Sequence, residues 1–144
     1  PTNLVNLLSN ESIKKIFHYA RFDLAIINKF LGVEIKNMFC TKIASKLVRT
    51  YTDKHGLKEL CKEMLNIDLN KSSQSSDWSA QNLSKAQLKY ASHDVIYLFR
   101  LMDKLEEMIV REGRKELLQK SFDFLPSRVK LDLAGWNDTD IFSH

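Results

Sequence analysis

The amino-acid pattern by itself predicts a mostly helical fold with a minor sheet. Apolar residues recur at helical spacing over most of the 144 residues. Only two short runs, residues 13–17 and 38–40, have the β-branched and aromatic character of strands. A sheet covered by helices on both faces needs more strand than this. Either the fold is largely helical, or its other strands belong to a segment outside these residues.

The first half of the chain predicts four helices. Thr2–Asn3 caps a short one, because a hydroxyl or amide before an apolar run satisfies the free backbone N–H groups of a first turn. Leu24–Leu31 has helical apolar spacing, and Gly32 follows it as a C-terminal stop. Residues 43–48 and 57–65 each carry one apolar face and predict two more helices.

The second half predicts a polar loop followed by two longer helices. Residues 70–79 are polar and without periodicity, which is typical of a loop. Ser84, with a glutamine three residues later, forms a capping box for a helix that continues to Gly113. A last helical pattern covers residues 114–136, and Pro126 should kink or break it because proline lacks a backbone N–H.

Charge and cysteine content exclude some classes of protein. The net charge of +4 arises from 22 basic and 18 acidic residues, which is compatible with an anionic partner but weak evidence alone. Cys40 and Cys61 form no CxxC pair, so we expect neither a zinc site nor a disulfide framework, and a reducing cytoplasm is the simplest setting. Residues 1–3 lack a signal-peptide pattern and no apolar run could cross a bilayer, so no membrane partner is expected.

Two segments combine residues suited to phosphodiester chemistry. His18-Tyr-Ala-Arg-Phe-Asp23 follows a predicted strand and opens a helix, and Tyr90-Ala-Ser-His-Asp94 places a phenol and a carboxylate on one helix face. Phosphodiester hydrolysis needs a nucleophile, charge neutralisation and a stabilised leaving oxygen. Two divalent metal ions about 3.5–4 Å apart supply all three when carboxylates hold them. Two carboxylates are few ligands for two such ions, so the site would want more acids.

Together these segments resemble the second and third motifs of ribonuclease D-like 3'-5' exonucleases, of the DEDDy branch. A lone Tyr-x-x-x-Asp is weak, since Tyr19 and Asp23 also form one, but both motifs in order with Ser76-Asp-Trp78 between them are specific. The resemblance extends to Phe122–Pro126 and Gly135–Trp136 and covers essentially the whole chain. It implies an α/β fold of the ribonuclease H-like type, with residues 1–144 as a single exonuclease domain that represents its C-terminal two-thirds.

The resemblance also implies roles for single residues. Asp94 would bind the tighter metal, Asp23 would support the second through water, and Tyr90 would position the attacking water. The cofactors would be two divalent ions, Mg²⁺ or Mn²⁺. The reaction would release nucleoside 5'-monophosphates from the 3' end of RNA or of single-stranded DNA.

The chain departs from the family in two places. The family's first motif, Asp-x-Glu on an early strand, is absent from these residues, and Asp138-Thr-Asp140 is rejected as a substitute because no strand pattern surrounds it. Gln81–Asn82 also stand where many relatives have Arg-Pro. We therefore expect the chain alone to be nearly inactive. We also expect a missing N-terminal segment or self-association to cover apolar helix faces that the absent strands would leave bare.

Candidate nucleic-acid contacts come from a helix and from the polar loop. Lys42, Lys46 and Arg49 lie at i, i+4 and i+7 and make a basic stripe, which usually is only a solvated helix face but would also suit phosphate contact. Lys71 and Gln74 in the loop complete the predicted set.

Other interpretations remain open from the residues alone. Asp23 could be a helix N-terminal partner and Tyr90 a half-buried helix aromatic. Besides an active exonuclease, the chain could be an impaired fragment or half of a split enzyme that retains nucleic-acid binding. A third class is a helical interaction domain. Metal-dependent nuclease activity separates the first from the others, and salt-dependent RNA binding separates the second from the third.

Overall fold

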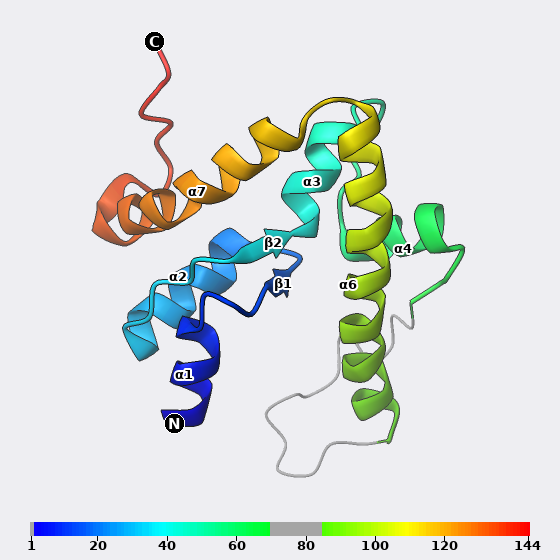
Figure 1. Cartoon of the computed structure of the whole chain (residues 1–144), viewed down its shortest axis with the longest axis horizontal. Coiled ribbons are helices and arrows are strands. Elements are labelled where there is room, and N and C mark those ends of the chain that lie inside the picture. Colours follow the sequence, from blue (N-terminus) through cyan, green and yellow to red (C-terminus); the bar gives the residue numbers. More distant parts are fainter. Residues whose placement is uncertain (1, 70–84) are drawn as a thin grey trace.

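The computed structural model describes residues 2–69 and 85–144; of residues 85–95 it describes the helical backbone alone. Helices dominate this part of the chain, and two short strands lie between them (Figure 1). In chain order the elements are α1 (Thr2–Ser9), β1 (Lys15–Phe17), α2 (Ala20–Leu31), β2 (Met38–Cys40), α3 (Thr41–Val48), α4 (Leu57–Leu65), α6 (Lys85–Arg111), α7 (Lys115–Leu131) and the π-helical turn η1 (Asp132–Trp136). None of the helices in the described ranges is both long and apolar enough to span a bilayer.

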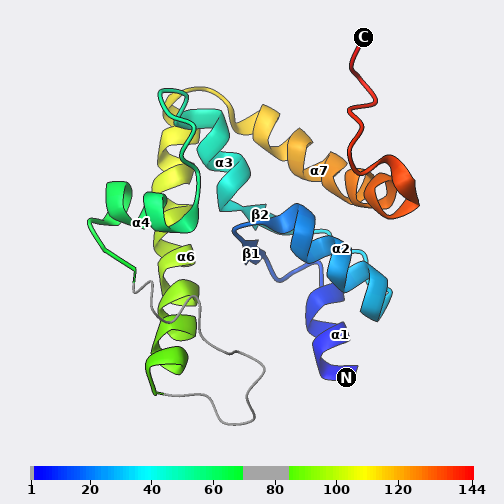
Figure 2. The same ribbon diagram turned by 180° about the vertical axis from the view of Figure 1, so that it is seen from behind.

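The two strands form a parallel pair joined by a crossover through α2. Lys15 pairs with Met38 and Phe17 with Cys40. The views from front and back both place α2 on one side of the strands and α6 on the other (Figures 1 and 2). Because the strands are parallel, their carboxyl ends share one edge of the sheet, and α2 and α3 both start there. This edge is where ligands bind in open α/β folds.

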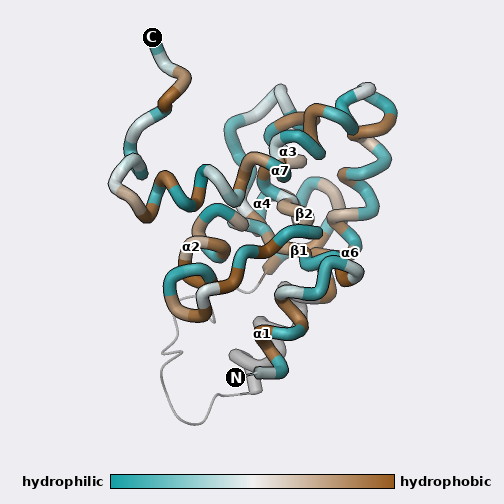
Figure 3. Tube along the Cα trace, turned by 60° about the vertical axis from the view of Figure 1, so that its left-hand side comes forward, coloured by the Kyte–Doolittle hydropathy of each residue, from teal (hydrophilic) through white to brown (hydrophobic). Residues whose placement is uncertain are grey.

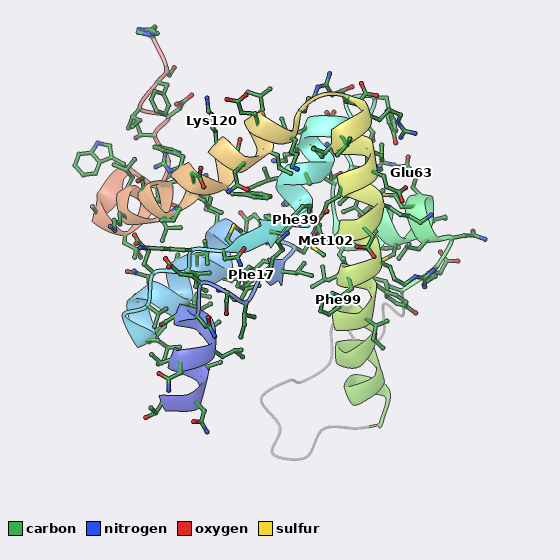
Figure 4. All side chains as sticks on the ribbon, in the orientation of Figure 1. Phe17, Phe39, Glu63, Phe99, Met102 and Lys120 are labelled. Carbon is green, nitrogen blue, oxygen red and sulfur yellow. The ribbon has the colours of Figure 1, made fainter. Side chains whose placement is uncertain are left out.

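One cluster of buried apolar side chains holds the described elements together. Its largest fully buried side chains come from the segment before β2 and from α4 and α6: Ile35, Leu60, Leu101, Leu105 and Ile109. The ring of Phe39 on β2 meets that of Phe122 on α7 edge to face, with centroids 5.3 Å apart. Figure 4 shows Phe17, Phe39 and Met102 in the region between the strands and α6.

Helix α2 ends where the sequence predicts. Gly32 takes a left-handed conformation with φ of 65°, which glycine adopts without strain, and its N–H donates to the carbonyl of Asn28. Phe22, Ile26 and Phe30 recur along α2 and are exposed, so the helix carries an apolar stripe on its outer side; apolar segments of α2 are visible in the hydropathy trace (Figure 3). The expectation that a missing N-terminal segment or self-association covers such apolar helix faces stays a prediction.

The last helix excludes one of the two effects expected of Pro126, a break. α7 runs continuously through Pro126, so the proline does not break it. Phe122, Leu125 and Val129 are all buried on the face that packs inward, and this burial on both sides of the proline outweighs the single backbone hydrogen bond that a proline removes. The α-helix ends at Leu131. The turn η1 follows it and contains Gly135 in a non-helical conformation, with φ of 110°.

Candidate active site at the carboxyl ends of the strands

The first predicted motif lies at the carboxyl edge of the sheet. His18 follows β1 directly, and Asp23 sits in the first turn of α2, where its backbone N–H donates to the carbonyl of Tyr19 at 3.1 Å. Because β1 and β2 are parallel and α2 begins directly after β1, the first turn that carries Asp23 starts at the shared carboxyl edge of the two strands. Burial raises the pKa of the Cys40 thiol at the end of β2; backbone hydrogen bonds lower it, and the Asp23 charge adds a smaller upward effect.

Side-chain hydrogen bonds tie the two strand ends together. His18 Nδ1 lies 2.9 Å from Thr41 Oγ1, which in turn donates to the carbonyl of Phe17 at 3.3 Å. The Cys40 thiol donates to the carbonyl of His18, also at 3.3 Å. These contacts fix the backbone from which α2 carries Asp23.

The His18 imidazole is held in its neutral form. Burial, reinforced by the nearby Lys42 ammonium, lowers the pKa of His18 to about 4, against a smaller upward pull from the His55 backbone carbonyl. Its Nε2 is buried, and no group in the described residues hydrogen-bonds to it. A neutral imidazole with one nitrogen bonded to Thr41 suits a structural role.

The Asp23 carboxylate is half-buried and has no ion pair or hydrogen bond to the side chains of residues 2–69 and 96–144. Removal from water raises the pKa of Asp23 above its ordinary value, and no described cation counters that effect. A partly desolvated, unpaired carboxylate is a suitable ligand for a hard divalent cation. It is a single ligand, however; no group of three metal-binding side chains occurs in the described part of the chain.

An exposed pair of aromatic side chains that the sequence motifs did not indicate flanks Asp23. The Tyr19 and Phe22 rings stack with centroids 5.8 Å apart and planes inclined by 25°. Lys42, in the first turn of α3, places its Nζ 4.2 Å from the Tyr19 ring centroid. The signal was present in the sequence as two aromatics three residues apart beside the motif aspartate, but their link to Lys42 required the strand pairing.

The second motif lies on α6. Tyr90 and Asp94 belong to the helical backbone of this element, which packs against β1, α3 and α4. Their side chains fall outside the described residues, so the expected approach of Asp94 to Asp23 stays a prediction. Lys71 and Gln74 of the polar loop, and the capping residue Ser84, also lie outside the described residues.

The predicted basic stripe is corrected at Arg49. Helix α3 ends at Val48, and Arg49 leaves helical geometry, so its side chain turns inward and is only 2% exposed. Its guanidinium donates to Glu63 and to the carbonyl of Lys54. Arg49 is therefore committed to an internal network. Lys46 is exposed and Lys42 partly exposed, and phosphate contact by these two stays a prediction.

A cavity of about 560 Å³ lies elsewhere, between β2, α6 and α7. Its described lining includes Lys36, Phe39, Ile109 and Phe122 but neither His18 nor Asp23. Because it brings together apolar walls and peripheral charges rather than candidate catalytic groups, the strand-end edge is the better candidate for chemistry.

Comparison with known proteins places this architecture among the exonucleases. Residues 2–110 match a family model described as 3'-5' exonuclease. Ribonuclease D of Gluconacetobacter diazotrophicus is 36% identical over 108 residues, which cover 75% of this chain and 27% of that protein. The chain therefore belongs to the 3'-5' exonuclease family, and its ribonuclease D-like character is confirmed.

Solved structures agree with this assignment. NrnC of Brucella melitensis has 55% sequence identity and a TM-score of 0.91, over 99% of this chain and 69% of that one. Two further structures of that protein contain bound Mg²⁺ and bound pGG. Escherichia coli RNase D, at 23% identity and a TM-score of 0.80, supports the fold alone. The expected ribonuclease H-like α/β exonuclease fold is confirmed, and the chain spans about a quarter of the length of the ribonuclease D relative.

Proposed function

We propose that this protein is a metal-dependent 3'-5' exonuclease that removes nucleotides from the 3' end of RNA. The observation that carries the proposal is the half-buried Asp23 carboxylate at the shared carboxyl edge of two parallel strands, which has no partner among the described side chains, in a chain of the 3'-5' exonuclease family. The bound pGG of the Brucella melitensis relative supports an oligonucleotide as ligand.

The proposed cofactors are two divalent ions, Mg²⁺ or Mn²⁺. Such ions, when bound, activate a water and stabilise the charge that develops on phosphate oxygens. Asp23 fits the part of a ligand because it is partly desolvated and pairs with none of the side chains that the structure describes. Asp94 would provide a second carboxylate and Tyr90 would orient the attacking water. The relative that contains bound Mg²⁺ supports a divalent ion, and the number of ions is our proposal.

The test uses the complete protein and a short single-stranded RNA labelled at its 5' end. We expect stepwise shortening from the 3' end in Mg²⁺ or Mn²⁺, release of nucleoside 5'-monophosphates, and no reaction in EDTA. Asp94→Asn should abolish turnover, whereas Tyr90→Phe should reduce it and leave RNA binding largely intact. A DNA strand of the same sequence tests whether the protein prefers RNA to DNA. Internal cleavage, or unchanged turnover in Asp94→Asn, would contradict the proposal.

The second candidate is a catalytically impaired member that retains nucleic-acid binding. It is favoured by the finding that residues 2–69 and 96–144 contain no group of three or more side chains that could hold a metal ion. In that case the complete protein would bind single-stranded RNA with a steep dependence on salt and would not shorten it.

We also propose that the protein works in the cytoplasm. Both cysteines, Cys40 and Cys61, are buried and free of disulfides, which supports a reducing compartment. Cell fractionation with an antibody to the protein tests this, and recovery outside the cytoplasm would overturn it.

A further inference from the structure

The Tyr19–Phe22 pair is an exposed aromatic surface without an evident role in folding. Tyr19 is 48% and Phe22 55% exposed, although the two rings stack on each other. Neither side chain belongs to the buried cluster or to the partly buried residues that pack against it. Large aromatic side chains usually bury most of their surface, so an ordered pair that remains open calls for a ligand or a partner.

Two features distinguish this pair from the rest of the exposed stripe on α2. First, Lys42 reaches across from α3 and lies over the Tyr19 ring. Second, the pair adjoins Asp23: Phe22 precedes it in the chain, and Tyr19 lies one helical turn before it, with a backbone hydrogen bond between them. An aromatic surface, a cation and a candidate catalytic carboxylate thus occur together at one edge of the sheet.

We propose that Tyr19 and Phe22 form a stacking platform for a nucleobase of the single-stranded substrate, with Lys42 beside it for the backbone phosphate. The proposal rests on the exonuclease function proposed above. A π surface next to a positive charge matches the chemistry of single-stranded nucleic acid, in which each nucleotide presents one flat base and one anion. The platform would hold the strand near Asp23 and so align its terminal bond.

Recognition by stacking has a definite consequence for specificity. Every base has a π face, so the platform would accept all four bases with similar affinity. It would not accept a nucleotide that lacks its base. Affinity should therefore be nearly independent of sequence and fall sharply when one position of the strand is abasic.

The experiment measures binding of a short oligoadenylate to the complete protein, with Ca²⁺ in place of Mg²⁺ so that the strand is not consumed. Phe22→Ala and Tyr19→Ala are each expected to weaken binding about 5- to 150-fold, the range for loss of one stacked base. Phe22→Tyr and Tyr19→Phe should bind like the wild type. Phe30→Ala is the matched control, because Phe30 is 73% exposed on the same helix and has its own lysine, Lys29, 5.6 Å from the ring centroid.

A second arm tests whether the platform contacts a base. A series of strands, each abasic at a different position, is tested for binding. The wild type should lose affinity for the strand that lacks the base at one particular position. The Phe22→Ala protein should lose little further affinity for that strand, because the substitution and the missing base remove the same contact. Lys42→Ala should lower the salt dependence by about one phosphate contact, and Lys42→Arg should restore it.

The outcomes are separable from those of the proposed function. If the wild type neither binds nor shortens single-stranded strands, the exonuclease proposal fails and the platform fails with it. If the wild type binds and digests RNA but Phe22→Ala and Tyr19→Ala match it, the platform alone is wrong. Equal losses in Phe30→Ala, or a change in oligomeric state in Phe22→Ala and Phe30→Ala alike, would show that the stripe is covered by protein and would also overturn the platform.

Discussion

Arg21 and Asp132 are joined by two parallel hydrogen bonds, Nε to Oδ2 at 2.7 Å and Nη2 to Oδ1 at 2.6 Å, across 111 residues of sequence. Arg21 also donates to the carbonyl of Asn137 at 2.9 Å. Arg128 supports the same carboxylate from one helical turn earlier. The motif helix α2 is thus fastened to the C-terminal turn η1, and Arg21 lies only two residues before Asp23.

Replacing Arg21 with glutamine should loosen this attachment. Removing a bidentate charged pair costs about 1–2 kcal/mol here, because the Arg21 side chain is 42% exposed and partly screened by solvent. Urea denaturation of both proteins measures the loss. In limited proteolysis, the segment that follows residue 132 should be cleaved faster in the variant than in the wild type. Equal rates of cleavage would show that the C-terminal turn does not depend on Arg21.

The same pair sets a dependence on pH. The hydrogen bond from Arg21 lowers the pKa of Asp132, so its contribution to stability is complete above the ordinary aspartate pKa of about 3.9 and is lost as pH falls through the lower folded value. The stability difference between wild type and Arg21→Gln should be constant from neutral pH down to about pH 5 and shrink below pH 4. A difference that grew on acidification would contradict the assignment.

His18 should make the fold sensitive to acid at a higher pH. Burial and Lys42 lower its pKa to about 4 in the folded chain, below the ordinary value of about 6.5 in the unfolded chain. The unfolded state binds the extra proton between these values, so stability is complete above pH 6.5 and falls by a few kcal/mol as pH drops toward 4. The His18→Gln protein should be less stable at pH 7, but its free energy of unfolding should fall less between pH 6.5 and 4. If the free energy of unfolding falls equally steeply in both proteins, another group causes the acid sensitivity.

Arg49→Met should destabilise the fold without a direct effect on nucleic acid. The substitution leaves the Lys54 carbonyl without its buried donor and the Glu63 carboxylate without its cation, at a cost of about 2–4 kcal/mol. Glu63→Gln is the control; because Glu63 is 41% exposed, it should cost about 1 kcal/mol or less. Thermal unfolding gives both values. If Arg49→Met instead left stability intact and reduced the salt dependence of RNA binding, the predicted basic stripe would be right after all.

Asp23→Asn should separate stability from metal binding. Because the carboxylate is partly desolvated and has no partner among residues 2–69 and 96–144, its amide replacement should leave the metal-free protein as stable as wild type, or more stable by about 1 kcal/mol. Mg²⁺ or Mn²⁺ should raise the melting temperature of the wild type and raise that of the variant less. Equal shifts in both proteins would remove Asp23 from the set of metal ligands.

Pro126→Ala should stabilise α7. The proline lies inside a continuous helix and cannot donate a backbone hydrogen bond, so alanine restores one donor and improves helix propensity, for a gain of about 1–3 kcal/mol. Chemical denaturation measures the gain. A loss of stability would mean that the proline ring's packing matters more than the missing hydrogen bond.

The local elements and the family motifs could be predicted from the amino-acid pattern. Strand β2 at Met38–Cys40 and the end of α2 at Gly32 occur where predicted, because apolar periodicity and the left-handed freedom of glycine act over a few neighbouring residues. His18–Asp23 and Tyr90–Asp94 were recognisable as motifs for the same reason, since each is a local string.

Which distant residues meet could not be predicted from the pattern and depends on how the elements pack. The inward turn of Arg49 depends on α3 ending one residue earlier than its charge spacing implied, and on Glu63 from α4 lying within reach. The contacts of Lys42 with Tyr19 and of Arg21 with Asp132 depend on parallel strand pairing and helix packing. Such contacts join side chains from separate elements, and their energies depend on burial and geometry that no spacing along one element encodes.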